Sequence, residues 1–298
     1  MKRIFLIAAS IFLANCIKAQ GCSDAGFCSL KYHGAGAAKN SISVGNVSGV
    51  TDGNTFVNGS YISFSRRLGE KVNWDTKLTA NYASGSLATN FNAGDVITSF
   101  SVTAFKSKVE QNSLGFLGGV KIPLTAANDK AAGKPLPMAY QSSLGTYDLL
   151  LGADYIMNNW EFTHAWQIPL TRQNKNTFIQ QYSVSNDFVS TNKFHRTADA
   201  LVRIAYTIKR ETSKFLFKPN LLVVYHLADD SFEDIYAVRR KLAGSKGVTL
   251  NANIIARYSI TKMQQLELSV AAPFVVRDIR PDGLTREFTA GLEYKISF

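Results

Sequence analysis

The chain of 298 residues carries 33 Lys and Arg against 22 Asp and Glu, and its mean hydropathy of −0.04 is near neutral. The basic residues stand singly or in short groups such as 239–241, without the dense patch that binds nucleic acid. Composition therefore argues against a nucleic-acid partner and favours contact with anionic lipid headgroups. It does not decide the fold, which depends on the pattern along the chain.

Residues 1–19 are predicted to be a secretory signal peptide. Lys2 and Arg3 precede a mainly apolar stretch of ten residues at 4–13, and a short polar stretch follows. The apolar run is too short for a transmembrane helix, which needs about 20 residues. Cleavage starts the mature chain at Gln20 and leaves 30 basic residues against 22 acidic ones.

A lipoprotein signal is the alternative interpretation of this segment. Residues 13–16 end in Cys16 and loosely resemble a lipidation box. Asn directly before the cysteine fits that box poorly, so ordinary signal cleavage is favoured.

Residues 20–40 are predicted to form a periplasmic amino-terminal segment. Cys22 and Cys28 are an even pair in an oxidising compartment and predict a disulfide that closes a small loop. That loop either staples the tail or enters the barrel mouth as a small plug. Two thiols with only His33 nearby fall short of the four ligands of a zinc site, so no metal and no cofactor are predicted.

Residues 41–298 break into stretches in which apolar side chains alternate with polar ones. At 248–260 one face is apolar, and only Ile255 is apolar on the other. These stretches exceed the 5 or 6 residues usual in soluble strands and suit tilted strands that cross a bilayer. The same alternation appears at 72–82, at 160–170 and at the chain end.

The connections between these stretches predict the topology. Short connections are expected near Gly69, Gln111, Asn158, Glu211 and Lys262, and long ones at 85–95, 125–145, 172–196, 228–245 and 277–285. Short periplasmic turns and long external loops are typical of bacterial outer-membrane barrels. We therefore expect an all-β fold, a transmembrane antiparallel up-and-down β-barrel of about twelve strands in the cell outer membrane.

Aromatic residues near the segment ends are placed as interface girdles would be. They are Trp74, Tyr82, Tyr155, Trp160, Trp166, Tyr206 and Tyr258. The alternative is a large soluble β protein in which these aromatics form the core.

The last strand resembles the carboxy-terminal signal that outer-membrane assembly machinery recognises. Its pattern is Tyr294, Ile296 and the terminal Phe298, at every second position. The resemblance implies that this machinery is a partner.

Two segments support a further, diffuse resemblance. Residues 136–148, followed by Gly152 and Tyr155, are similar to a segment of outer-membrane transporters of the phenol-degradation-pathway family, whose barrels are likened to long-chain fatty-acid transporters. Residues 268–285 are compatible with that family's end region. The resemblance covers about half of the chain and assigns no substrate-binding residue. The Gln20 start and overall style also look like proteins of the Bacteroidetes.

The histidines give little support to an enzyme. His164 lies on the apolar face between Phe162 and Trp166, but it lacks the following outward serine of outer-membrane phospholipases. His195 falls in a long loop without an obvious catalytic neighbour. A lipid hydrolase is therefore the third hypothesis, and no enzyme is predicted.

The inward face of the predicted strands carries charges of both signs. The candidate lumen residues are Asp75, Lys77, Lys121, Asp148, Asp154, Glu161, Arg203, Lys218, His226, Arg257, Glu267, Glu293 and Lys295. Such a set suits either a hydrated passage or a salt-bridge network that fills a narrow barrel. The sequence leaves these two interpretations equally open.

The leading hypothesis is a passive transporter or channel for small hydrophobic or amphipathic molecules. A closed structural or surface-interaction barrel is the alternative. Residues 229–243 place Phe232, Ile235, Tyr236 and Leu242 at helix-like spacing beside the basic group 239–241. This segment is expected to form a lid that admits a solute or rests on outer-membrane lipid and lipopolysaccharide.

Overall fold

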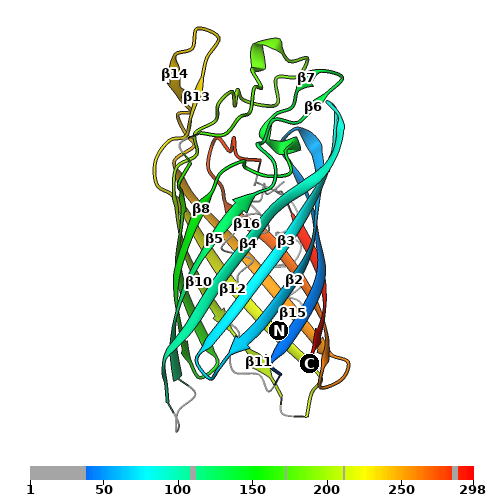
Figure 1. Ribbon diagram of the computed structural model, residues 1–298, viewed down its shortest axis with the longest axis vertical. Coiled ribbons are helices and arrows are strands. Elements are labelled where there is room, and N and C mark those ends of the chain that lie inside the picture. Colours follow the sequence, from blue (N-terminus) through cyan, green and yellow to red (C-terminus); the bar gives the residue numbers. More distant parts are fainter. Residues whose placement is uncertain (1–37, 108–111, 172, 211, 284–287) are drawn as a thin grey trace, which may run out of the picture.

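The computed structural model describes residues 38–107, 112–171, 173–210, 212–283 and 288–298. The predicted signal peptide, Cys16 and the predicted disulfide between Cys22 and Cys28 lie outside the described residues. The chain forms an upright barrel whose external loops gather at one end (Figure 1). The strands of its wall are β1 (Asn40–Thr51), β2 (Thr55–Leu68), β3 (Val72–Ser84), β4 (Thr89–Lys106), β5 (Asn112–Pro123), β8 (Asp148–Met157), β9 (Trp160–Pro169), β10 (Asp199–Tyr206), β12 (Phe215–His226), β15 (Gly247–Ser259), β16 (Gln264–Val275) and β17 (Thr289–Ser297).

The sheet closes on itself, and every neighbouring pair is antiparallel. β1 pairs with β17 over nine residues, and β10 pairs with β12 over seven. The short strand β11 (Ile208–Lys209) extends β10 after a single residue and also pairs with β12, so the ring has twelve strands. The prediction of a twelve-stranded up-and-down barrel is confirmed.

The outer wall is apolar and the inner wall is polar. In β9, Phe162 and His164 are exposed, whereas Thr163, Ala165 and Gln167 are buried. The same alternation puts large apolar side chains on the outside of all twelve strands. In water so continuous an apolar surface would be unfavourable, but a bilayer solvates it. The barrel is therefore of the outer-membrane type, and the soluble alternative does not fit. Among the described residues no helix has the length and apolar character needed to span a membrane.

Three of the aromatic residues predicted to form girdles, Trp160, Tyr206 and Tyr258, cluster at the periplasmic ends of their strands. The rings of Trp160 and Tyr206 lie 4.8 Å apart, and those of Phe215 and Tyr258 lie at the same separation. Amphipathic rings of this kind settle at the membrane interface and fix the depth of the barrel.

The external connections are less regular than predicted. Residues 85–95 are not a long loop: the connection covers 85–88, and β4 runs on for 18 residues. The sequence misleads because Gly94 marks a β-bulge inside the strand. There the Asp95 N–H donates to the hydroxyl of Thr79 at 2.7 Å, and a Cβ at Gly94 would lie 2.3 Å from that oxygen. The first external connection is also short, a single 3-10 turn, η1 (Asp52–Asn54).

The helix-like spacing at 229–243 is a wrong prediction as well. The segment forms a β-hairpin of β13 (Ser231–Glu233) and β14 (Arg239–Lys241). Its turn is fixed by Asp234, whose carboxylate accepts the backbone N–H groups of Tyr236 and Val238, each at 2.9 Å. Local side chain to backbone bonds of this type favour a turn over a helix.

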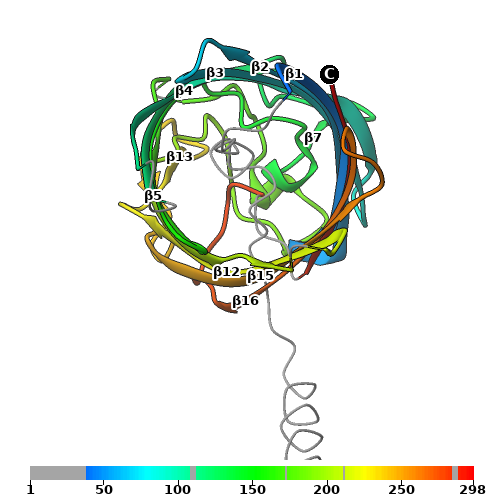
Figure 2. The same cartoon turned by 90° about the horizontal axis from the view of Figure 1, so that it is seen from below.

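The long external loops fold back over and into the barrel. Seen from below, these loops lie across the opening of the ring of strands (Figure 2). The loop 124–147 carries the short hairpin of β6 (Lys130–Ala131) and β7 (Lys134–Pro135) and the 3-10 turn η2 (Met138–Tyr140), and the loop 170–198 carries η3 (Gln180–Tyr182).

Two apolar clusters hold the loops together. One joins Tyr140 and Phe188 to Val57 of the wall, and the other joins Met138, Leu144 and Phe194 of the loops. We call the packed part of the loops the external plug.

We expect replacement of Tyr140 by Ala to loosen this plug. Its ring is 1% exposed and meets Phe188 edge-on at 5.7 Å, so removal leaves a cavity that costs about 3–5 kcal/mol. Limited proteolysis of the refolded protein should cut the external loops faster, while the barrel keeps its heat-modifiable migration on gels. Tyr182→Ala is the control, because the Tyr182 side chain is 75% exposed. Its external loops should be cut at the wild-type rate.

Candidate functional site

The lower part of the barrel holds a cavity of about 190 Å³. Its walls are strand residues of both polar and apolar character. Charged and aromatic members are Tyr61, Asp75, Lys77, Arg203, Glu267 and Glu293, and apolar members include Ile97, Leu222, Ile255 and Val270. The cavity can therefore hold water or a small solute with both kinds of surface.

Several charges that line the lower lumen form ion pairs between strands of the wall. Glu161 accepts from Arg203 at 3.1 Å and from Lys218 at 2.6 Å. Arg257 binds Glu267 at 2.7 Å. These side chains line the lumen, and each is neutralised by a partner on another strand of the wall.

A second set of lining contacts surrounds Tyr61. Its hydroxyl donates to Glu293 at 2.6 Å, and the Lys77 ammonium lies 3.6 Å from the ring centre. Gly45 makes this position possible, because a Cβ there would lie 2.3 Å from the ring. The tyrosine therefore lies flat against the wall of the cavity.

The remaining lower lumen candidates lie on the same inward face. Asp75 is hydrogen-bonded by the Ser65 hydroxyl, and Asp154 by the Thr163 hydroxyl. Lys295 alternates with the exposed Tyr294 and Ile296 and is also inward.

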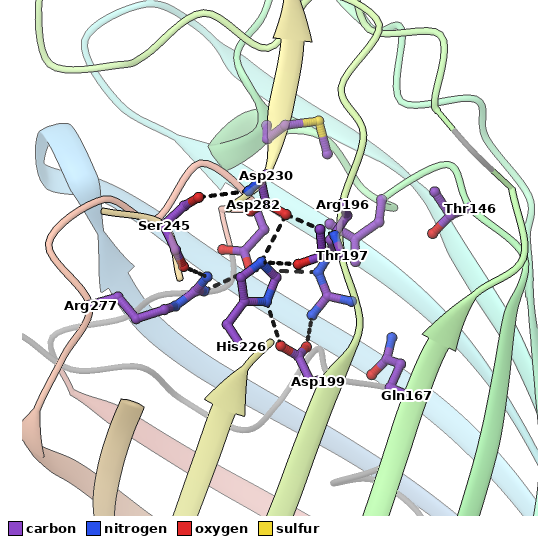
Figure 3. Close-up of polar contacts among 12 residues, drawn as sticks. Thr146, Gln167, Arg196, Thr197, Asp199, His226, Asp230, Ser245, Arg277 and Asp282 are labelled. Carbon is purple, nitrogen blue, oxygen red and sulfur yellow. Dashed lines mark hydrogen bonds and ion pairs between the residues drawn. The ribbon is translucent and has the colours of Figure 1, made fainter. Parts of the chain in front are cut away.

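Buried ion pairs lie in the upper lumen, some within the wall or the loops and others between the two (Figure 3). In the wall, Lys121 of β5 and Asp148 of β8 are 2.8 Å apart, and both side chains are fully buried. From the loops, Arg196 binds Asp199 of β10, and Arg277 binds Asp282 at 2.9 Å. A further contact of 3.7 Å joins Arg196 to Asp282.

His226 is the centre of this cluster. Its Nδ1 lies 2.6 Å from Asp199 of the wall and its Nε2 lies 2.8 Å from Asp230 of the β12 to β15 loop. A neutral imidazole has one N–H, whereas two carboxylate acceptors require two. The geometry therefore assigns a protonated His226 that ties a loop to a strand.

The cluster is balanced in charge when His226 is protonated. Its cations and anions are four of each, namely Lys121, Arg196, His226 and Arg277 against Asp148, Asp199, Asp230 and Asp282. We call these eight residues the ionic lock. Pairing of this kind is what allows charges to stay buried, since removal of one partner leaves an uncompensated charge.

Asp282 shows the effect of the lock on a loop carboxyl. Burial alone would raise its pKa, but the guanidinium groups of Arg277 and Arg196 and the nearby His226 lower the pKa to about 2. The lock therefore keeps Asp282 ionised at ordinary pH.

Alternation along the sequence predicts an inward direction for only three members of the lock, Lys121, Asp148 and His226. The other five lie at or beyond strand ends, where alternation gives no direction. The sequence carries one weak indication of these ion pairs, which is the short spacing of opposite charges between Arg196 and Asp199 and between Arg277 and Asp282.

Two further cavities continue the lower one toward the outside. A cavity of about 40 Å³ shares Lys77 and Ile97 with the lower cavity. It shares Met138, Ala139 and Gly283 with an external cavity of about 210 Å³. The middle cavity is the smallest of the three, and Gly283 packs closely against η2 in its wall. The backbone of Gly283 has φ +68°, and a Cβ there would lie 2.6 Å from the Met138 carbonyl oxygen.

His164 lies on the outer wall, where its Nε2 accepts the indole N–H of Trp166 at 2.7 Å. Within the described parts of the chain, no three His, Cys, Asp or Glu side chains are grouped to hold a metal ion.

No protein-family model matches the chain, and no curated protein matches it in sequence. Its fold is similar to that of an outer membrane channel from Pseudomonas putida F1, with a TM-score of 0.63 and 12% identity over 90% of this chain and 98% of that one. Looser likenesses are to the NanC porin (TM-score 0.45, 10% identity, 87% and 98% covered) and the KdgM porin (TM-score 0.44, 8% identity, 87% and 99% covered). At these identities the likeness concerns the fold.

We expect the buried pair Lys121 and Asp148 to show strong coupling in a double-mutant cycle. Lys121→Met alone leaves a buried carboxylate and should cost about 3–5 kcal/mol. The double change Lys121→Met and Asp148→Leu should recover most of that loss, because no lone charge remains. Urea unfolding in lipid vesicles measures the free energy of unfolding of the single and double variants. If the losses of stability from the two changes simply add, the proposed pairing is contradicted.

We also expect an acid transition in the external plug. Asp282 has a lowered folded pKa, so its contribution is complete above its unfolded pKa of about 3.9 and is lost as the pH falls through about 2. Pepsin should therefore cut the external loops faster at pH 2 than at pH 4. The external loops of the Asp282→Asn variant should be cut rapidly at both pH values. An equal cleavage rate of the wild type at pH 2 and pH 4 would contradict the role assigned to Asp282.

Proposed function

We propose that the protein is a passive outer-membrane channel or transporter for small amphipathic molecules. The observation that carries the proposal is the series of three cavities, which share wall residues from the lower lumen to the external side. A solute follows this series and passes the narrow point between η2 and Gly283 when the external plug loosens.

The walls favour a solute that has both polar and apolar parts. The external cavity combines Phe188, Val189 and Ile279 with Asp187 and Asp278. The lower cavity mixes carboxylates and a guanidinium with aliphatic side chains. The resemblance to the phenol-degradation-pathway transporters supports the same solute class.

The alternative is a closed barrel with a structural or surface-interaction role. The balanced ionic lock supports it, because eight paired charges can fill the upper lumen permanently. In that case the cavities hold water and conduct nothing. Conductance in planar bilayers separates the two functions.

We expect the mature protein to give discrete, repeatable openings in symmetric salt. The double variant Arg277→Gln and Asp282→Asn removes one cation and one anion of the ionic lock and frees the loop 276–283 from its anchor. It should therefore raise the open probability or the conductance severalfold without changing net charge.

The double variant Glu70→Gln and Lys71→Gln is the matched control for this measurement. It also removes one charge of each sign, but at an exposed periplasmic turn. Its conductance should equal that of the wild type. If wild type and lock variant both stay silent while heat-modifiable migration shows a folded barrel, the channel proposal is wrong and the closed barrel is favoured.

A further inference from the structure

The hairpin of β13 and β14 stands above the rim of the barrel at its edge (Figure 1). Neighbouring loop segments run beside it. The Asn192 side-chain amide donates to the Glu233 carbonyl at 2.9 Å, and Arg239 donates to the Lys193 carbonyl at 2.7 Å. The Lys193 N–H in turn donates to the Asn176 carbonyl at 2.8 Å. These contacts build one continuous external layer.

Six basic side chains are exposed on or beside this layer. They are Lys175, Lys193, Arg239, Arg240, Lys241 and Lys246, and we call them the external basic surface. The carboxylates among them are Asp229, Glu233, Asp234 and Asp278, which lies beside Gly244, so the surface has a net charge of +2, six cations less four anions. The pKa of Asp234 is lowered by the hydrogen bond from Arg240, so this carboxylate is counted as ionised.

The cations differ in how they are compensated. Lys193 binds Glu233 at 2.7 Å and Arg240 binds Asp234 at 2.8 Å. The Arg239 guanidinium donates to neutral oxygens. Within the described residues, the ammonium groups of Lys241 and Lys246 form no hydrogen bond or ion pair, although both contribute to the lowered pKa of the exposed Asp229 carboxyl. The surface can thus accept an anion without breaking an existing ion pair.

The surface begins where the apolar outer wall ends. Tyr225 and Val248 are exposed on the outside of β12 and β15, one residue from the external ends of those strands. Lys246 directly precedes β15. The first cation therefore lies at the level of lipid headgroups, where cationic side chains attract anionic lipid.

The tip of the hairpin adds apolar surface. Ile235 and Val238 are 43% and 44% exposed, and the Tyr236 side chain is 77% exposed. Apolar side chains beside cations match a ligand that carries phosphates next to acyl chains.

We propose that the external basic surface binds the phosphate groups of the glycolipid in the outer leaflet, and that the hairpin is a lipid clamp at the rim. Binding is electrostatic and therefore weakens as salt increases. It holds the loop between β12 and β15 against the membrane surface.

The test measures binding of lipid A to the mature protein in detergent by native mass spectrometry. The double variant Lys241→Gln and Lys246→Gln removes two charges whose side chains make no hydrogen bond in the described structure. At about 1 kcal/mol for each charge near a lipid surface, affinity for bisphosphorylated lipid A should fall about 25-fold. Lipid A stripped of phosphate should bind weakly to wild type and variant alike.

The matched control is Lys209→Gln and Lys262→Gln, two exposed lysines at the periplasmic end. It should bind lipid A as the wild type does. Heat-modifiable migration on gels verifies that the wild type, the variant and the control are all folded. Equal losses in the control and the variant, no loss in the variant, or equal binding of dephosphorylated lipid A would each overturn the proposal. Bilayer conductance is a separate measurement, so failure here leaves the channel proposal standing.

Discussion

Backbone amides that face lipid must find partners within the protein, because an unpaired group there costs several kcal/mol. The pairing of β1 with β17 and of β10 with β12 removes both open edges of the sheet. Closure with antiparallel neighbours requires an even strand number, and it makes inward and outward faces alternate along every strand. The polar interior and the apolar exterior follow from this single constraint.

A polar interior creates a second requirement, since charges that lose water must be neutralised by neighbours. In the lower lumen the partners come from wall strands that are adjacent or one strand apart, as for Glu161 of β9 with Arg203 of β10 and Lys218 of β12. At the external end the partners come from loops, and the ionic lock couples the wall to the plug through His226. The position of the loops is thus set by electrostatics as well as by the packing of Tyr140 and Phe188.

The alternation of polar and apolar residues along the chain was sufficient to predict the barrel, because this local pattern alone distinguishes the inward face of each strand from its outward face. The same rule oriented Lys121, Asp148 and His226. It failed at Gly94, where a bulge looks like a turn, and at 229–243, where a hairpin imitates helical spacing. The alternation rule does not predict where the side chains of Arg196, Asp230, Arg277 and Asp282 point. These residues lie in loops, where the side-chain direction depends on contacts with residues distant in sequence.

The ionic lock also bears on the order of assembly. Its members come from five regions of the chain, and Arg277 and Asp282 lie just before the final strand. The connection between β16 and β17 thus brings the last cation and the last anion of the lock beside Arg196 and His226. The lock is complete only when this connection is in place, so the closure of the interior depends on the final hairpin of the wall.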